Sequence, residues 1–411
     1  MNKKVVVAMS GGVDSSVAAA LLKEQGYDVY GLTMKLANRE SREGRSFGGC
    51  CGSKDFFDAR SVAQTLGIPH YSYDYVETFK ISVIDYFKSS YIKGETPNPC
   101  IACNQHVKFD ALLKHALALG ADYLATGHYA QIESYSSPSP LVGDHRTDAL
   151  MDDGHPSKKI GSDGGRDGGK PSNVAPPPSP SPTRGEGKVM YSLKKGADPA
   201  KDQTYVLYGL GQAELSRLLF PLGGFSKTQI RELARKYGLK TADKPDSYEI
   251  CFVPNEDYKQ FIDEEVTPSE RPVGPIRHKD GRVLGQHRGL PYYTIGQREG
   301  LGIAVGHPLY VVGLETATNT LVVGEKPDVY SNVLALGDVT WVSGQAPTLP
   351  LDVKIKIRSK HSEASAQLVG QQNSNLTAVF DEAQSAVTPG QAAVFYQGDV
   401  VLGGGVIKNG Q

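Results

Sequence analysis

The sequence predicts a multidomain protein: an N-terminal α/β domain built on a doubly wound parallel sheet, a small central mixed domain and a C-terminal antiparallel β-barrel. Short apolar runs alternate with helical patterns up to about residue 130. Turns and β-type runs become frequent after about residue 255, and alternating strands follow from residue 338. The 411 residues are enough for two or three domains, whose expected bounds are 1–252, 255–328 and 332–408.

In the N-terminal domain the expected elements alternate between strand and helix. The strands are Val5–Ala8, Val29–Met34, His70–Tyr73 and Tyr123–Thr126. The helices are Leu21–Gln25 (the end of an Ala/Leu-rich segment), Phe56–Leu66, Tyr75–Tyr91 and Phe109–Leu119. Because this alternation is typical of βαβ units, we expect a parallel sheet with a site at the carboxyl ends of its strands.

A segment of unusual composition interrupts this domain. No aromatic residue occurs between Tyr135 and Tyr191, and Gly, Pro, Ser and Asp dominate the stretch. Such a stretch cannot bury enough apolar surface to offset the entropy lost on ordering. We therefore expect residues 136–187 to be a disordered insertion at a loop tip, with the fold resuming at Val189.

The remaining elements are read from local patterns. Helices are expected at Gln203–Gly209, Gln212–Leu219 and Ser226–Tyr237, the last with a Ser N-cap and a following glycine. After about residue 255 the β-type runs are Arg282–Leu284, Tyr310–Val312, Thr320–Val323 and Val333–Leu336. The barrel strands from residue 338 onward are Val353–Ile357, Thr377–Phe380, Ala392–Tyr396 and Val400–Gly404.

Charge, hydropathy and cysteine content exclude several classes of protein. The net charge of −1 does not indicate general affinity for nucleic acid, so any RNA contact must come from local clustering. No apolar run approaches the roughly 18 residues of a membrane span, and we expect a cytoplasmic protein with no membrane contact. The five cysteines do not indicate a disulfide framework, and a structural role is expected for the pair Cys50 and Cys51.

The first strand is followed by a Gly-Ser loop that opens a helix, with the sequence Ser-Gly-Gly-Val-Asp-Ser-Ser at residues 10–16. Backbone N–H groups and the helix dipole at such a junction favour a phosphate chain, and glycines let the main chain approach it closely. The loop lacks the Gly-Lys-Ser/Thr of a Walker A motif. It resembles the pyrophosphate loop of the Rossmann-like ATP pyrophosphatases. The candidate ATP contacts are Ala8, Met9, Ser10, Gly11, Gly12, Val13, Asp14, Ser15 and Ser16.

Asp14 has two interpretations. It is a candidate magnesium ligand, because departure of pyrophosphate requires charge neutralisation, or it only N-caps the helix.

Several further motifs occur in order along the chain: TPNPCIACNQHVKFD (96–110), ATGHYA (125–130), KDQTYVLYGL (201–210), LFPLGGFSKTQIRELA (219–234), EICFVPN (249–255) and YTIGQREGLGI (293–303). With the loop they make the chain similar to the bacterial tRNA-specific 2-thiouridylases. The resemblance implies an enzyme that adenylates the C2 oxygen of the wobble uridine, at position 34 of tRNA, and displaces AMP with sulfur. It also implies that Met34 and Gly127 bind ATP.

The same resemblance assigns the sulfur chemistry to two cysteines. Cys251 would carry a persulfide, loaded by a sulfur carrier or a cysteine desulfurase, and Cys103 would resolve the bond as a transient disulfide. A cysteine reacts as its thiolate. For Cys103 that form is favoured by basic residues of its own motif and of the ATGHYA motif, namely His106, Lys108 and His128.

Cys100 departs from the family pattern, in which aspartate is common. Its thiol could transfer a proton, or Cys100, Cys103 and Cys251 together could hold a [4Fe–4S] cluster with one open iron. A zinc site is disfavoured because structural zinc takes four protein ligands. The persulfide and cluster mechanisms both stay open at this point.

Contacts to tRNA are implied by the resemblance at ten positions: Asn98, Pro99 and Cys100 at the target base, and His128, Lys201, Asp202, Gln203, Arg358, Ser359 and Gln391 elsewhere. Ser359 replaces the usual aromatic residue, which weakens the expected contact there. Residues 188–244 carry eleven Lys or Arg against five Asp or Glu. This local excess of positive charge could bind along the phosphate backbone of the RNA.

The expected partners are tRNAs decoding Lys, Glu and Gln, together with ATP and Mg²⁺. Two alternatives keep part of the pattern. One is an amidating ATP pyrophosphatase, which needs no cysteine pair, and the other is a non-catalytic tRNA-binding protein.

Overall fold

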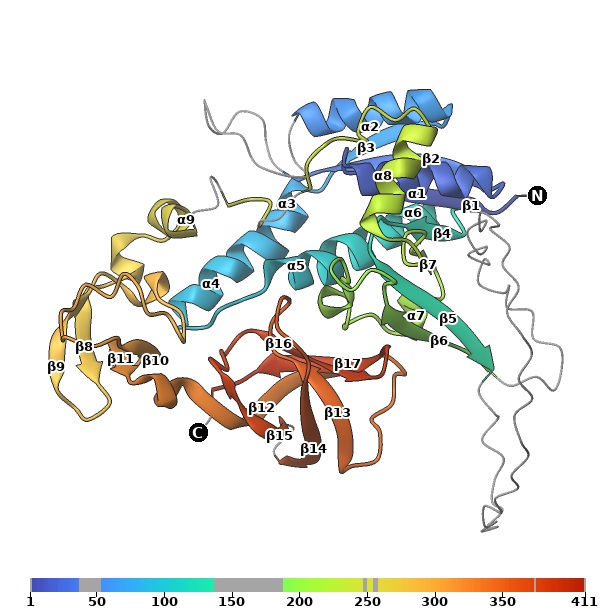
Figure 1. Cartoon of the computed structure of the whole chain (residues 1–411). Helices are drawn as coiled ribbons and strands as arrows, with labels where there is room; N and C mark the ends of the chain where they lie inside the picture. Colours follow the sequence, from blue (N-terminus) through green and yellow to red (C-terminus); the bar gives the residue numbers. More distant parts are fainter. Residues whose placement is uncertain are drawn as a thin grey trace, which may run out of the picture.

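The computed structural model describes residues 2–36, 53–136, 188–246, 250–253, 258–372 and 375–409. Figure 1 shows the N-terminal domain lying above the C-terminal barrel, with the central domain to one side. Cys50, Cys51 and almost all of the expected insertion at 136–187 lie outside the described residues.

The N-terminal domain is organised around a five-stranded parallel sheet. Its strands are β1 (Lys4–Ala8), β2 (Asp28–Lys35), β3 (His70–Asp74), β4 (Tyr123–Ala125) and β7 (Leu218–Leu219), in the order β3-β2-β1-β4-β7. Val5 and Val7 belong to one buried cluster and Val6 to another, so both faces of β1 are covered. The expected doubly wound parallel sheet is confirmed.

Helices cover both faces of this sheet. α1 (Val13–Glu24), α2 (Ser53–Leu66) and α8 (Lys227–Lys236) belong to the first face. The other carries α3 (Val76–Phe79), the π-helix η1 (Lys80–Asp85), α4 (Tyr86–Ile92), α5 (Pro99–Ala102), the π-helix η2 (Cys103–Leu112) and α6 (Leu113–Ala118). The helices expected at 75–91 and 109–119 are present, but π-helical turns, which frequently mark functional sites, interrupt both stretches.

The segment 203–219 differs from its expectation. Its helical elements are only the 3₁₀ turn η3 (Thr204–Val206) and the short α7 (Gln212–Leu215), so the helix expected at Gln203–Gly209 was wrong. The helix expected at Gln212–Leu219 ends at Leu215, and Leu218–Leu219 form β7 instead. Tyr205 and Tyr208 are both buried here, and the Tyr205 hydroxyl donates to the Ala392 carbonyl (2.9 Å). Anchoring to the barrel therefore overrides local helix propensity.

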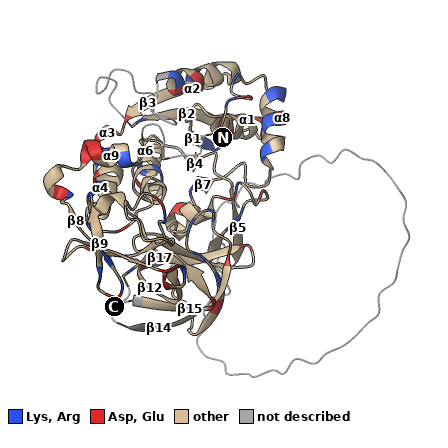
Figure 2. Ribbon diagram, turned by 60° about the vertical axis from the view of Figure 1, so that its left-hand side comes forward, with Lys and Arg blue, Asp and Glu red and all other residues tan. Residues whose placement is uncertain are grey.

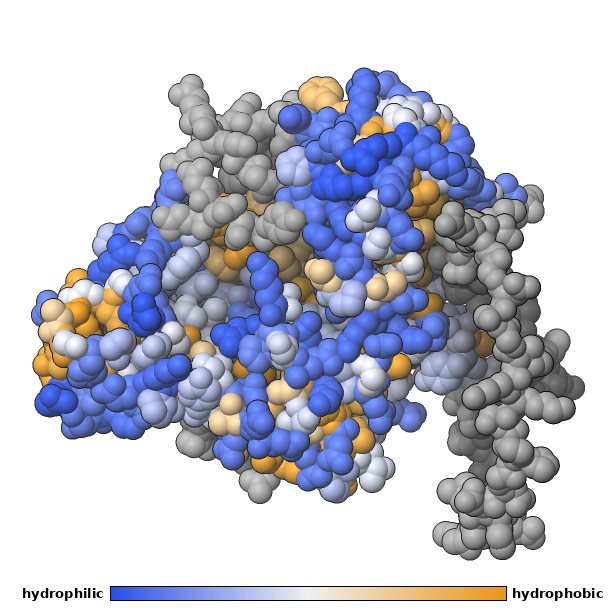
Figure 3. Space-filling view, in the orientation of Figure 1, coloured by the Kyte–Doolittle hydropathy of each residue, from blue (hydrophilic) through white to orange (hydrophobic). Residues whose placement is uncertain are grey.

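The central domain begins with α9 (Tyr258–Glu265) and η5 (Pro268–Glu270). Its four-stranded sheet has the order β10-β11-β8-β9, with η6 (Leu290–Tyr292) following β9. The strands are β8 (Gly274–His278), β9 (Val283–His287), β10 (Tyr310–Glu315) and β11 (Thr320–Gly324). β11 pairs parallel with β8 and the other pairs are antiparallel, so the sheet is mixed. Figure 3 shows hydrophobic residues gathered over this domain at the left. Val273 and Val283, both in the central domain, are exposed.

The C-terminal domain is a closed antiparallel barrel. After η7 (Lys326–Val329) come β12 (Tyr330–Trp341), β13 (Leu351–Lys356), β14 (Ala364–Gln372), β15 (Asn375–Ser385), β16 (Ala392–Gln397) and β17 (Val400–Ile407). The order β12-β15-β14-β13-β16-β17 closes through pairing of β12 with β17, around a core that includes Leu336, Ile355 and Phe395. The expected barrel is confirmed, although β14 was not anticipated.

Two connections fix the barrel to the N-terminal domain. The hairpin of β5 (Ala130–Ser136) and β6 (Val189–Lys195) adds to the barrel edge, where β6 pairs with β17. The Thr96 amide donates to the Pro389 carbonyl (2.8 Å), and the Gln391 side chain donates to the Thr96 carbonyl (2.9 Å). The barrel therefore braces the loop that leads into α5.

Within the described residues, none of the helices has the length and apolar character needed to cross a bilayer.

Candidate active site

The Gly-Ser loop joins β1 to α1 in a conformation that only glycine accommodates at one position. Gly11 has φ of +74°, and a Cβ there would lie 2.2 Å from the Asp55 carbonyl oxygen. The Ser15 hydroxyl accepts from the Ser10 amide (3.1 Å), and the Ser16 hydroxyl donates to the Gly12 carbonyl (2.7 Å). The loop is thus held in shape by its own serines at the start of a helix, as an anion site requires.

The end of β4 lies directly against this loop. A Cβ on Gly127 would be 2.8 Å from the Ser15 nitrogen and 3.0 Å from the Asp14 Cβ, so a larger residue would displace the loop. Met34 lies near the end of β2 and is partly buried. Both positions are at the carboxyl edge of the sheet, where open α/β sheets bind ligands.

Asp14, at the start of α1, is held by an ion pair and a hydroxyl. Its carboxylate lies 2.8 and 2.9 Å from the Lys227 ammonium and accepts from the Tyr129 hydroxyl (2.7 Å). Burial raises the pKa of Tyr129, and the adjacent Asp14 charge raises it further, so the hydroxyl stays a donor. Lys227 enters from α8, whose basic residues are visible in Figure 2.

A second carboxylate extends this ion-pair network. Asp246 lies 2.8 Å from Lys227, 2.7 Å from Lys201 and 2.9 Å from Arg231. Burial would raise the pKa of Asp246, but hydrogen bonds from Lys201 and Lys227 outweigh it and hold the pKa below its ordinary value. Three cations therefore share two carboxylates beside the loop.

Lys244 contacts the loop from its other side. Its ammonium donates to the Gly11 carbonyl (3.0 Å) and to the carboxylates of Asp55 and Asp58 (2.7 Å each). The ion pairs tie α2 and the segment after α8 to the loop backbone.

Sequence reasoning treated Lys201, Lys227, Arg231 and Lys244 as part of an RNA-facing surplus. The structure turns all four toward carboxylates near the loop. The spacing of the residues gives no signal that Lys227 pairs with Asp14, because 213 residues separate them.

The three described cysteines lie in one neighbourhood. Asn98 caps the turn of α5 by accepting from the amides of Cys100 (3.1 Å) and Ile101 (3.3 Å). Cys100 is exposed, Cys103 is buried and Cys251 is half-buried. Cys251 is close enough to Cys100 for their charges to interact, and Cys103 lies three residues after Cys100 along the same helical stretch, so residues 148 positions apart are brought to the same region.

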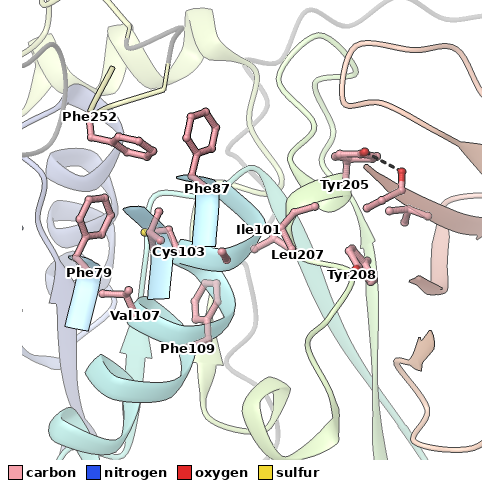
Figure 4. Packing of buried hydrophobic residues seen from close by; sticks show 14 of the residues in the cluster. Phe79, Phe87, Ile101, Cys103, Val107, Phe109, Tyr205, Leu207, Tyr208 and Phe252 are labelled. Carbon is pink, nitrogen blue, oxygen red and sulfur yellow. Dashed lines mark hydrogen bonds between the residues drawn. The ribbon is translucent and has the colours of Figure 1, made fainter. Parts of the chain in front are cut away.

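An aromatic group positions the Cys251 segment. The Phe252 ring lies 5.8 Å from Phe79, 5.3 Å from Phe87 and 5.5 Å from Phe261 in edge-to-face arrangements. Figure 4 shows Phe252 above Phe79 and beside Phe87, on the side of the cluster that holds Cys103. Phe252 thereby anchors its neighbour Cys251 near α5.

The raised pKa of the Cys100 thiol sets it apart from a reactive thiolate. Atoms packed around its sulfur raise the pKa of Cys100, nearby Cys251 raises it further, and Lys108 acts in the opposite direction. At neutral pH Cys100 is therefore a protonated thiol, suited to donating a proton.

His128 is buried, with 7% of its surface exposed, and packs against the rings of Phe109 and Phe220, which also contact each other. Burial holds its pKa well below the ordinary value, and Lys108 lowers it further, so the ring is neutral. Its Nδ1 lies 2.6 Å from the Thr126 hydroxyl oxygen.

Several residues expected to contact tRNA make internal hydrogen bonds. Gln203 accepts from the Tyr129 amide, Asp202 from the Gly196 amide and the Thr204 hydroxyl, and Arg358 donates to the Ser385 carbonyl. Gln391 braces Thr96, as described above. These side chains shape the surroundings of α5 and of the β4–β5 connection. Pro99 is buried and Ser359 is exposed beside Arg358.

The residues present were tested for metal binding by the arrangement of their donors. No group of three or more His, Cys, Asp or Glu side chains within the described residues is placed to hold a metal ion. Cys100, Cys103 and Cys251 are described and do not form such a group, so their arrangement does not fit an iron–sulfur cluster. Asp14 is a single carboxylate at a phosphate-type loop, which fits magnesium, since Mg²⁺ in nucleotide sites takes one or two carboxylates plus phosphates.

Comparison with known proteins identifies the family. The tRNA-specific 2-thiouridylase MnmA of Carboxydothermus hydrogenoformans is 46% identical over 99% of this chain and 98% of its own length. The corresponding protein of Acetivibrio thermocellus is 44% identical over 99% of both chains. The chain belongs to the tRNA-specific 2-thiouridylase family. The family and enzyme class expected from the motifs are thereby confirmed.

Each of the three parts of this 2-thiouridylase family member matches a known domain family. Residues 3–155 and 182–255 match the tRNA methyl transferase HUP domain, 259–325 the tRNA methyl transferase PRC-barrel domain, and 331–407 the aminomethyltransferase β-barrel domain. Two of these descriptions mention methyl transfer, whereas the relatives named above are described by 2-thiolation.

Proposed function

We propose that this chain uses ATP to replace the C2 oxygen of the wobble uridine of tRNA with sulfur. Full-length similarity to tRNA-specific 2-thiouridylases supports this proposal. The position of Lys108 also supports it, because its charge acts both on Cys100 and on His128, which follows β4 of the sheet that carries the loop. The proposed acceptors are tRNAs for Lys, Glu and Gln, and the proposed location is the cytoplasm, where tRNA and ATP meet.

In the first step ATP is held by its phosphates at residues 10–16. The uracil C2 oxygen attacks the α-phosphorus and the bond to pyrophosphate breaks. The C2 oxygen then carries AMP, which is a good leaving group. The phosphates compete with Asp14 for Lys227, which is 12% exposed and already lies at the loop. A magnesium ion held by Asp14 and the phosphates would neutralise charge on the departing pyrophosphate.

In the second step sulfur arrives on Cys251 as a persulfide from a sulfur carrier or a cysteine desulfurase. The terminal sulfur forms a bond to C2 and the C2–O bond to AMP breaks. The Cys103 thiolate attacks the Cys251 sulfur, so that the S–S bond of the persulfide is replaced by a Cys103–Cys251 disulfide. A reductant then restores both thiols. Cys100, protonated at neutral pH, would donate a proton near the base.

The donor arrangement favours this persulfide route over an iron–sulfur route. No group of three or more His, Cys, Asp or Glu side chains within the described residues is placed to hold a metal ion, and Cys103 is buried whereas Cys100 is exposed.

Nucleoside mass spectrometry tests the proposal. Unmodified tRNA, ATP and a persulfide donor are incubated with the protein, and 2-thiouridine at position 34 with stoichiometric AMP is expected. Absence of 2-thiouridine in both aerobic and strictly anaerobic reactions would overturn it.

A further inference from the structure

A cavity of about 350 Å³ lies beside the candidate active site, between the N-terminal domain and the barrel. η1, α4, α5 and η2 form one wall, and Gly390, Ala392 and Val406 of the barrel form the other. Pockets of this size hold small molecules or single residues of a larger ligand.

The chemistry of the wall is specific. Two tyrosines, Tyr86 and Tyr208, line the cavity together with the polar side chains of Asn98, Gln105 and His106. No Lys, Arg, Asp or Glu occurs among its lining residues as the structure describes them. A phosphate would require cations, whereas aromatic rings combined with neutral amides and an imidazole match the π-face and hydrogen-bonding edge of a nucleobase.

The place of the cavity favours a nucleobase attached to the substrate. Ile101 and Ala102 line the cavity from the same helical turn that carries Cys100, and Cys100 is close enough to Cys251 for their charges to interact. Asn98 uses its carbonyl oxygen to cap this turn, so its amide N–H₂ is the group that can meet a base edge. A base in the cavity and a uridine at Cys100 would be separated by only one turn of helix.

We propose that this cavity binds a second unstacked base of the anticodon loop, the immediate neighbour of the uridine that is thiolated. The inference rests on the proposed function and deepens it. Thiolation would then depend on the identity of the neighbouring base, because the amide and imidazole groups read its edge while Tyr86 and Tyr208 contact its ring.

A double-mutant cycle tests the contact between protein and base. An anticodon stem–loop is prepared intact, and with an abasic nucleotide on the 5′ or the 3′ side of the target uridine. Binding to the full-length protein is measured by fluorescence anisotropy without ATP, for the wild type and for Tyr86→Ala. We expect one abasic position and Tyr86→Ala each to weaken binding by about 5- to 150-fold, with no further loss when combined.

Matched variants control for fold and for aromatic content. Tyr86→Phe keeps the ring and should bind normally, and Tyr71→Ala removes an exposed tyrosine outside the cavity (51% exposed) and should change binding less than twofold. Gln105→Leu provides a second cycle if Tyr86→Ala does not fold.

The outcomes separate this inference from the proposed function. Additive losses at both neighbours would overturn the cavity proposal while 2-thiouridine formation continues. Coupled losses without any 2-thiouridine would uphold the cavity and overturn the sulfur transfer. Failure of the wild type to bind the stem–loop would overturn both.

Discussion

The phosphate loop and the cysteine region are stabilised in different ways. Around the loop, charged groups from remote segments are paired directly: Asp14 with Lys227, Asp246 with three cations, and Lys244 with two carboxylates. Around the cysteines the support is apolar, since Phe252 packs among three phenylalanines and Cys103 lies in the same cluster.

This difference suggests a division between the two half-reactions. A paired ionic network fixes positive charge before ATP arrives, which is how preorganised sites stabilise developing charge. An apolar wall lets the Cys251 segment shift by small repacking. We therefore expect substitutions in one region to affect adenylation and those in the other to affect sulfur transfer.

The largest effect should come from Cys251→Ser. A hydroxyl cannot carry a persulfide, so 2-thiouridine formation should fall by at least about 10³-fold. ATP-dependent AMP release on tRNA should persist within a few-fold, because the ionic network at the loop is untouched. Both products are measured in one reaction, by nucleoside mass spectrometry and by AMP chromatography. Equal loss of AMP would break the proposed division.

Lys227→Met should produce the opposite pattern. Removing this ammonium leaves Asp14 without its ion-pair partner and removes a cation from the phosphates, so AMP formation should fall by about 10²-fold. Labelling of Cys251 by a persulfide donor, followed by mass spectrometry of the intact protein, should be unchanged.

Arg235→Met is the matched control for that experiment. Arg235 lies on the same helix and forms an exposed ion pair with Asp243, remote from Asp14, so AMP formation should stay within twofold of wild type. A comparable loss in both variants would mean that α8 acts only through general stability.

The extent to which the sequence predicted these two regions also differs. Ser10–Ser16 was identified because its residues are contiguous and its chemistry is local: glycines at a strand–helix junction imply a phosphate site. Lys227, Asp246 and Lys244 were missed as partners of the loop, because the pairing of residues over 180 positions apart is set by the packing of α8 on α1. The cysteines were singled out by family resemblance, and no local pattern linked Cys103 to Cys251.

Strong local periodicity was sufficient to predict several helices and strands of the fold. Contacts between distant segments, which anchor a segment in the tertiary structure, could not be predicted. β1, β2, β3 and α8 lie within a few residues of their expected bounds. The expected helix at Gln203–Gly209 failed because Tyr205 and Tyr208 bury their rings against the barrel, a contact that the sequence pattern does not contain.

Phe252→Leu should sharpen the comparison with a smaller effect. Shrinking this ring loosens the wall beside Cys251, which should slow thiolation about tenfold through misplacement of the sulfur, with AMP release unchanged. The free energy of unfolding should fall by about 1–2 kcal/mol. Phe261→Leu, a similar loss from the same aromatic group but not adjacent to Cys251, is the control. Equal slowing in both variants would show that the position of Phe252 has no particular importance.

The last expected effect is on stability and its pH dependence, with the least change in turnover. In Asp246→Asn the three cations lose a shared charge, which should lower the free energy of unfolding at pH 7 by about 1–3 kcal/mol. Because the pKa of Asp246 is depressed in the folded state, its contribution is present above the unfolded pKa of roughly 3.9 and is lost as pH falls through the folded value.

Urea unfolding of wild type and Asp246→Asn, from pH 7 down to pH 3, measures this contribution directly. The two stability curves should be separated by a constant amount above about pH 5 and converge as the pH approaches the folded pKa. A separation that stays constant through pH 3 would mean that the carboxylate charge contributes nothing and that the network is held by packing of α8. In that case the ionic half of the site would be supported in the same apolar way as the cysteine half, and the contrast between them would fail.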